Sequence, residues 1–129
     1  MPITSRDFAD SAVRLAKSEL EVDYRNAISR GYYAMYHLCL ESLQHIPKYS
    51  NNHHQSLISY MKNKNECKLE SYDKQKLKVL AYRLAQQRGE RNRADYDAFT
   101  DCIKKESAET AIESMNKFIE DWAILTSNI

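Results

Sequence analysis

Residues 108–125 read AETAIESMNKFIEDWAIL. Apolar side chains recur through this stretch at steps of three and four residues, which is the spacing of one face of an α-helix. The pattern predicts a long amphipathic helix at the end of the chain, and no other stretch is as regular. The residues expected on its inward face are Ala108, Ala111, Ile112, Met115, Phe118, Ile119, Trp122 and Leu125.

Four further segments upstream also show helical spacing. A first helix is predicted to start at Ser5, with that residue as its cap, and a second to open at Asp23 and end just before Pro47. A third spans His53–Lys62, and a fourth begins near Tyr72 or Asp73 and ends at a break over residues 97–105. Residues 47–52 are predicted to form a loop, and the polar residues 63–71 are the best candidate for a mobile connection.

Composition agrees with a helical fold. The 129 residues include only two glycines and two prolines, so few turns interrupt the chain. This length fits one domain. The sequence therefore predicts an all-α protein with a single domain over residues 1–129, built as an antiparallel bundle of four long helices and one short helix.

The overall charge excludes a protein that attracts polyanions over its whole surface. Nineteen Lys and Arg face 18 Asp and Glu, giving a net charge of +1 and a pI of about 7.7, so any nucleic-acid surface has to be local. The three cysteines form no CxxC pair, the first residues lack the apolar run of a signal peptide, and no segment approaches the roughly 20 apolar residues of a membrane span. We expect a cytoplasmic protein without a membrane partner.

The fourth helix changes character in its second half. At about 100° per residue, the inward face that contains Leu77 and Leu84 continues into Arg88, Arg91 and Asp95. Charged side chains are rarely buried without partners, so the bundle is expected to open there to solvent, a second subunit or an anionic ligand. Two interpretations stay open. In the first, the helix runs beyond the bundle and its arginines are solvated or pair with Glu90, Asp95 and Asp97. In the second, the arginines form a phosphate-binding surface, since a guanidinium group can bind phosphate oxygens in two places.

The second helix concentrates aromatic and basic residues. Helical spacing places Arg25, Ser29, Tyr32 and Tyr36 on one flank, and Arg30, Tyr33 and His37 on the back. This pattern is typical either of an aromatic packing face or of a surface that meets RNA or a second subunit, where rings stack on bases and arginines hold phosphates.

Three segments in this order resemble the motifs of bacterial HEPN domains. Residues 25–37, RNAISRGYYAMYH, resemble the second-helix signature of that family, and residues 53–57, HHQSL, are similar to its histidine-containing start of a short third helix. Residues 91–96, RNRADY, stand where the family has Arg-Asn-x-x-x-His. The resemblance covers about residues 5–125 and implies a helical bundle that forms a homodimer, with the arginine elements of both copies in one cleft.

The resemblance also implies roles for individual residues. Catalytic HEPN proteins cleave RNA without a metal ion in toxin–antitoxin, phage-defence and CRISPR systems. Their motif arginine stabilises charge at the scissile phosphate, and their motif histidine assists attack by the 2′-hydroxyl. Arg91 and Asn92 match the Arg-Asn positions here, and Tyr96 takes the histidine position. The RNA-binding residues expected around this catalytic element are Arg88, Arg93, Arg25, Arg30, Tyr33 and His37.

Tyr96 departs from the family pattern in a way that matters chemically. An unperturbed tyrosine has a pKa of about 10, whereas histidine titrates near neutrality, and losing a positioned acid–base group lowers a rate by roughly 10²–10⁴. His37 or His54 could stand in. Two functions are therefore predicted: a ribonuclease-like HEPN toxin or phage-defence component that acts on RNA, or a non-catalytic HEPN adaptor that binds RNA or a protein such as a nucleotidyltransferase antitoxin or a defence effector.

No metal or cofactor is expected. His53, His54, Cys67 and Cys102 lack the spacing of a four-ligand zinc site, and the chain has neither a glycine-rich nucleotide loop nor a nucleophile elbow. Cys39 lies on the apolar face of the second helix and is expected to be an inert core thiol.

Overall fold

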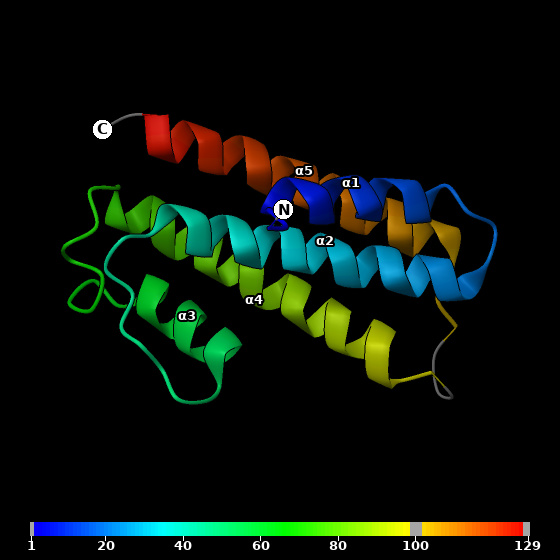
Figure 1. Cartoon of the computed structure of the whole chain (residues 1–129), viewed down its shortest axis with the longest axis horizontal. Coiled ribbons are helices and arrows are strands. Elements are labelled where there is room, and N and C mark those ends of the chain that lie inside the picture. The colour runs from blue at the N-terminus through cyan, green and yellow to red at the C-terminus, as the bar shows by residue number, and fades with distance from the viewer. Residues whose placement is uncertain (1, 99–101, 128–129) are drawn as a thin grey trace.

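The computed structural model describes residues 2–98 and 102–127, which fold into five α-helices without a strand (Figure 1). The helices are α1 (Ser5–Ala16), α2 (Glu21–Ser42), α3 (His53–Lys62), α4 (Lys74–Tyr96) and α5 (Lys105–Ser127). The all-α prediction is confirmed. Because α1 has only 12 residues and α3 has 10, against 22 or 23 in the others, the described helices are three long and two short, not four and one.

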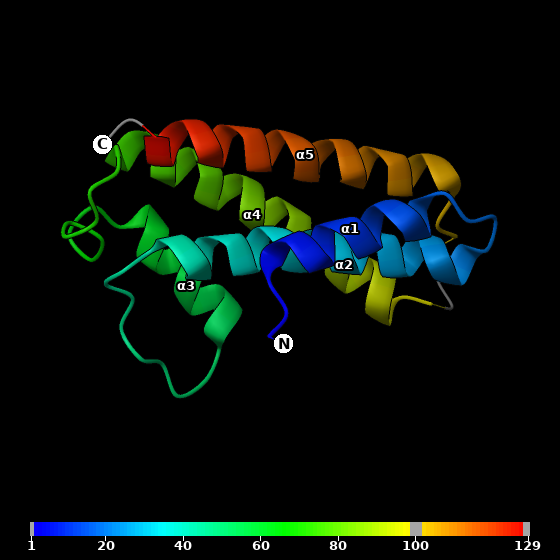
Figure 2. The same ribbon diagram turned by 45° about the horizontal axis from the view of Figure 1, so that its top comes forward.

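The helices are arranged around α2, which contacts α1, α4 and α5 (Figures 1 and 2). α2 and α4 run antiparallel, since Arg25 near the start of α2 bonds to the carbonyl of Ala94 near the end of α4. α3 packs against α4. This topology places the arginine-rich half of α4 beside the tyrosine-rich face of α2.

Large side chains from α2, α3 and α5 fill the core. Trp122, Tyr32, Tyr60 and Phe118 are each no more than 2% exposed. The rings of Phe118 and Trp122 stack at 5.8 Å, and the indole Nε1 of Trp122 donates to Ser42 Oγ at 2.9 Å, which satisfies its buried donor. The predicted inward face of the last helix is confirmed, since all eight of its residues are buried or half-buried.

The end of the second helix was predicted just before Pro47, and this is wrong. α2 ends at Ser42, and Leu43 is already extended. The cause is a distant residue: the carboxylate of Glu70 accepts hydrogen bonds from the backbone N–H groups of Gln44 at 3.0 Å and His45 at 2.9 Å. The Glu70 carboxylate therefore replaces the helical carbonyls as the acceptor for these two N–H groups, so the chain can leave the helix without burying unpaired donors.

The segment 63–71, predicted as a mobile connection, is largely exposed but is anchored to the bundle by two buried residues. Cys67 and Glu70 are 1% and 4% exposed. The hydroxyl of Tyr60 donates to the Glu70 carboxylate at 2.6 Å, and the ammonium of Lys74 donates to the Glu70 carbonyl. Buried polar anchors of this kind hold a loop in place although its sequence is largely polar.

The starts of the helices lie close to their predicted positions. α1 is capped by Thr4 rather than by Ser5, and the backbone N–H of Thr4 donates to the Asp7 carboxylate at 2.8 Å. α2 begins two residues before the predicted Asp23. α4 begins as predicted, with Asp73 as its N-cap. Within residues 2–98 and 102–127, no helix combines the length and apolarity required to cross a membrane.

Candidate nucleic-acid interface

Arg91 lies on α4 with its guanidinium covered by aromatic rings of the same chain. It is only 6% exposed, and its guanidinium carbon is 5.4 Å from the ring centres of both Tyr32 and Tyr33 on α2, and 6.0 Å from that of Tyr96. The sequence predicted that the bundle opens at this position, and for Arg91 this is wrong. The π faces of tyrosine rings attract a cation, which allows the charged group to lie beneath them.

The polar contacts of Arg91 leave its charge only partly compensated. Nη1 is 3.9 Å from the carboxylate of Asp95 and donates a long hydrogen bond of 3.4 Å to the hydroxyl of Tyr96. Its buried Nε has no hydrogen-bond acceptor among the described residues. A guanidinium offers five N–H donors, so Arg91 retains unused donors and a strong positive field.

Arg88 lies one turn earlier on α4 and repeats this situation. Its Nη1 donates to the side-chain oxygen of Gln55 on α3 at 3.0 Å, while its buried Nε has no acceptor in the described part of the chain. Residues three apart share a helix face, so the two arginines act together. A helix that runs beyond the bundle does not describe Arg91, which is buried, whereas Arg88 is half-buried. The expected pairing with acidic residues is present in part, since Arg91 lies near Asp95 and Arg93 near Glu90.

His54 on α3 joins this pair of arginines. Its Nδ1 shares a hydrogen bond with the hydroxyl of Tyr32 at 2.8 Å, and its ring centre is 4.2 Å from that of Tyr36. Burial, together with the positive charges of Arg91 and Arg88, lowers the pKa of His54 to about 4. His54 is therefore neutral at pH 7. The sequence identified it only as a substitute for the missing histidine of the arginine motif, and the signal was its position in the HHQSL segment.

Arg30, Tyr33 and His37 share one face of α2, as predicted, and they continue the cluster toward α1. The ring of His37 stacks on Phe8 at 4.8 Å with an interplanar angle of 2°, and the guanidinium of Arg30 lies 5.7 Å from Phe8 and 5.1 Å from Tyr33. Burial lowers the pKa of His37. Phe8 was missed as a member of this surface, since its helical spacing indicates a core residue. Tyr33 links the two groups because Arg30 and Arg91 both contact its ring.

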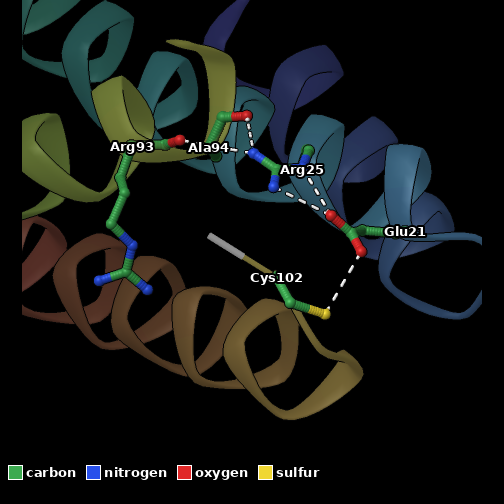
Figure 3. A network of polar contacts seen from close by, with 5 residues as sticks. All are labelled: Glu21, Arg25, Arg93, Ala94 and Cys102. Atoms are coloured by element: carbon green, nitrogen blue, oxygen red, sulfur yellow. Dashed lines mark hydrogen bonds and ion pairs between the residues drawn. The ribbon is translucent and has the colours of Figure 1, made fainter. Parts of the chain in front are cut away.

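Arg25 belongs to a different network, shown in Figure 3. It is 9% exposed, its Nη1 donates to the carbonyls of Ala94 at 2.9 Å and Arg93 at 3.5 Å, and its Nη2 is 2.9 Å from the Glu21 carboxylate. The thiol of Cys102 donates to the same carboxylate at 3.4 Å. Arg25 thus binds backbone carbonyls in the last turn of α4, which is a structural role for a cation at a helix C-terminus.

The remaining predicted residues are distributed around α4. Arg93 follows Arg91 by about 200° on the helix, and its guanidinium lies 3.8 Å from the carboxylate of Glu90, so it is not brought together with Arg88 and Arg91. Asn92 is half-buried. Tyr96 is 72% exposed at the end of the helix, beside Arg91. An aromatic ring in this position can stack on an incoming base.

The cysteines and histidines do not form a metal site within the described residues. No three His, Cys, Asp or Glu side chains there are arranged to hold a metal ion. Cys39 is fully buried, and burial raises the pKa of its thiol, in agreement with the predicted inert core residue.

Comparison with known proteins gives no match to this chain, whether with family models, with curated proteins or with solved structures. The resemblance to HEPN domains stays a prediction that rests on the three sequence motifs.

Proposed function

We propose that this protein is a HEPN-like, RNA-directed protein that binds an RNA phosphate through Arg88 and Arg91. The observation that carries the proposal is the weak charge compensation of two arginines on adjacent turns of α4. Nη1 of Arg91 lies 3.9 Å from the Asp95 carboxylate, and Nη1 of Arg88 donates to the uncharged amide of Gln55. A phosphate supplies the negative charge that these two arginines lack, and its oxygens accept short, strong hydrogen bonds from guanidinium groups.

The aromatic surroundings favour RNA over a small anion. Tyr96 is exposed beside Arg91, and half-buried Phe8, Tyr33 and His37 form a continuous set of rings next to it. Proteins that bind single-stranded RNA combine basic groups for the backbone with rings on which unpaired bases stack, and each such stack contributes about 1–3 kcal/mol. A small anion would use the arginines alone.

Two versions of this function differ in chemistry. In the first, the protein is a ribonuclease-like toxin or defence component, with Arg91, Asn92 and Tyr96 at a cleft formed by two copies of the chain. In the second, it is a non-catalytic adaptor that binds RNA or a protein partner such as a nucleotidyltransferase. The exposed tyrosine hydroxyl at the position of the family's histidine favours the second version, since tyrosine is a poor acid–base catalyst near pH 7.

Binding is tested with a fluorescein-labelled single-stranded RNA pool and a chelator, using fluorescence anisotropy at two salt concentrations. We expect Arg91→Met to weaken binding about tenfold or more, because a charge-assisted contact contributes about 1.5–3 kcal/mol. The slope of the logarithm of affinity against the logarithm of salt concentration should also become shallower by about one, because one fewer counterion is released on binding. Arg6→Met is the matched control, since Arg6 is an exposed arginine on α1. Equal affinities for wild type and Arg91→Met would refute the proposal.

Cleavage of the same RNA, read on a denaturing gel, separates the two versions. We expect Tyr96→His to cleave RNA roughly 10²-fold faster than wild type if the ribonuclease version holds, because histidine restores the family's acid–base group. Absence of cleavage by both proteins, with RNA binding intact, favours the adaptor. Light scattering of the purified chain measures whether it forms the expected homodimer.

A further inference from the structure

His54 lies where α2, α3 and α4 meet. No catalytic motif in the sequence assigns a role to this residue. Its ring centre is 4.2 Å from Tyr36, 5.5 Å from Tyr32 and 5.9 Å from Tyr33, all on α2. The bond between Nδ1 and the Tyr32 hydroxyl fixes the orientation of the ring. Because the residue is half-buried, the imidazole is held by the protein without being sealed inside it.

The charged and titratable groups around His54 are mostly cationic or neutral. Arg88 and Arg91 act on it from α4, and His53 and His37 act on it from α3 and α2. Tyr32 and Tyr36 of α2 are neutral, because burial raises the pKa of both. The carboxylate of Asp95 lies 3.9 Å from Arg91 Nη1 and accepts a hydrogen bond from the hydroxyl of Ser29, and the carboxylate of Glu41 acts on His37. Protonation of His54 would therefore add a third positive charge to two that are poorly compensated.

We propose that His54 is a third anion-binding group of this site and takes up a proton from water when Arg88 and Arg91 bind an RNA phosphate. The inference rests on the proposed function, because it requires a phosphate at the two arginines. A protonated imidazole donates from both nitrogens, so Nδ1 donates to the Tyr32 oxygen and Nε2 donates to the phosphate. The bound phosphate supplies the negative charge that the free site lacks.

The consequence is a definite dependence of affinity on pH. In the free protein the pKa of His54 is about 4, so its imidazole is neutral over the range from pH 7.5 to 5.5. A phosphate that offsets the arginine charges raises this pKa toward the ordinary value of about 6.5. The complex then holds more protons than the free protein, and affinity increases as pH falls. With a pKa of about 6.5 in the complex, RNA binds about tenfold more tightly at pH 5.5 than at pH 7.5.

The test compares wild type, His54→Asn and His53→Asn in binding to the labelled RNA pool at pH 7.5, 6.5 and 5.5 and constant ionic strength. The asparagine oxygen can accept the Tyr32 hydrogen bond but does not titrate, and His53 is the exposed neighbour that serves as the matched control. We expect about a tenfold increase in affinity for wild type and His53→Asn, and twofold or less for His54→Asn. An equal pH dependence in all three proteins, with Arg91→Met still defective, would overturn the inference and leave the proposed function standing.

A second measurement uses the wild-type protein only. NMR titration of the His54 ring, with and without saturating RNA, gives its pKa in both states. We expect the pKa to rise when RNA is bound. An unchanged pKa in the RNA complex overturns the inference even if His54→Asn does not fold, whereas absence of arginine-dependent RNA binding at every pH overturns the proposed function itself.

Discussion

Replacing Arg91 by methionine should stabilise the free protein while it weakens RNA binding. Methionine keeps an unbranched, flexible side chain under the tyrosine rings but removes the guanidinium of a residue that is only 6% exposed. The variant loses a cation–π contact with Tyr32 and Tyr33 and a long bond to Tyr96. It also removes a buried charge whose ion pair with Asp95 is at 3.9 Å and whose Nε has no acceptor among the described residues.

The magnitude follows from comparing these contributions. The ring contacts of a desolvated cation contribute about 2 kcal/mol, and methionine recovers about 0.3–1.5 kcal/mol of this through its sulfur. Removing one unsatisfied buried donor increases the free energy of unfolding by about 1–3 kcal/mol, and removing the poorly compensated charge increases it further. We expect the free energy of unfolding to increase by about 1–2 kcal/mol, which raises Tm by about 3–8 °C for a domain of this size.

Thermal unfolding, followed by circular dichroism in the absence of RNA, measures this difference. The matched control is Arg83→Met on the same helix, whose guanidinium has a close partner in Asp121 at 2.6 Å and should therefore lower Tm when removed. A fall in Tm for Arg91→Met as large as that for Arg83→Met would contradict this expectation. It would mean that Arg91 contributes net stability, and that the site is not electrostatically unsatisfied in the free protein.

The other predictions concern the polar anchors of the fold. Glu70→Gln should destabilise the protein by about 2–3 kcal/mol, measured by urea unfolding, because the carboxylate accepts three hydrogen bonds in a buried position. Burial opposes ionisation of Glu70, but the bonds from Tyr60 and two backbone N–H groups outweigh it and lower its pKa. A lowered folded-state pKa contributes stability above about pH 4.5 that is lost as pH falls through the folded value, so wild type should lose stability on acidification more steeply than Glu70→Gln. Arg25→Met should cost about 1–2 kcal/mol and speed hydrogen exchange at the end of α4, because the carbonyl of Ala94 loses its donor. Unchanged exchange near Ala94 would contradict the structural role of Arg25.

Sequence periodicity was sufficient to predict the helical class and most of the helix faces. Periodicity alone identified the buried face of α5 around Phe118 and Trp122, and the face of α4 around Leu77 and Leu84, because a helix that covers a core repeats its apolar residues every three or four positions. The shared flank of Arg25 and Tyr32 on α2 followed from the same rule. The Arg91-Asn92 pair, and the tyrosine at position 96 where the family has histidine, were also recognised from the sequence. The HEPN prediction still rests on such motifs.

The partners of the polar and charged groups became apparent only in the folded chain. Glu70 ended α2 before its predicted boundary, the rings of Tyr32 and Tyr33 covered Arg91, and α3 brought His54 into the same cluster. Each of these contacts joins segments that are distant in the sequence. Local periodicity indicates which face of a helix is apolar. Whether a charged side chain can be buried depends on the distant groups that compensate its charge.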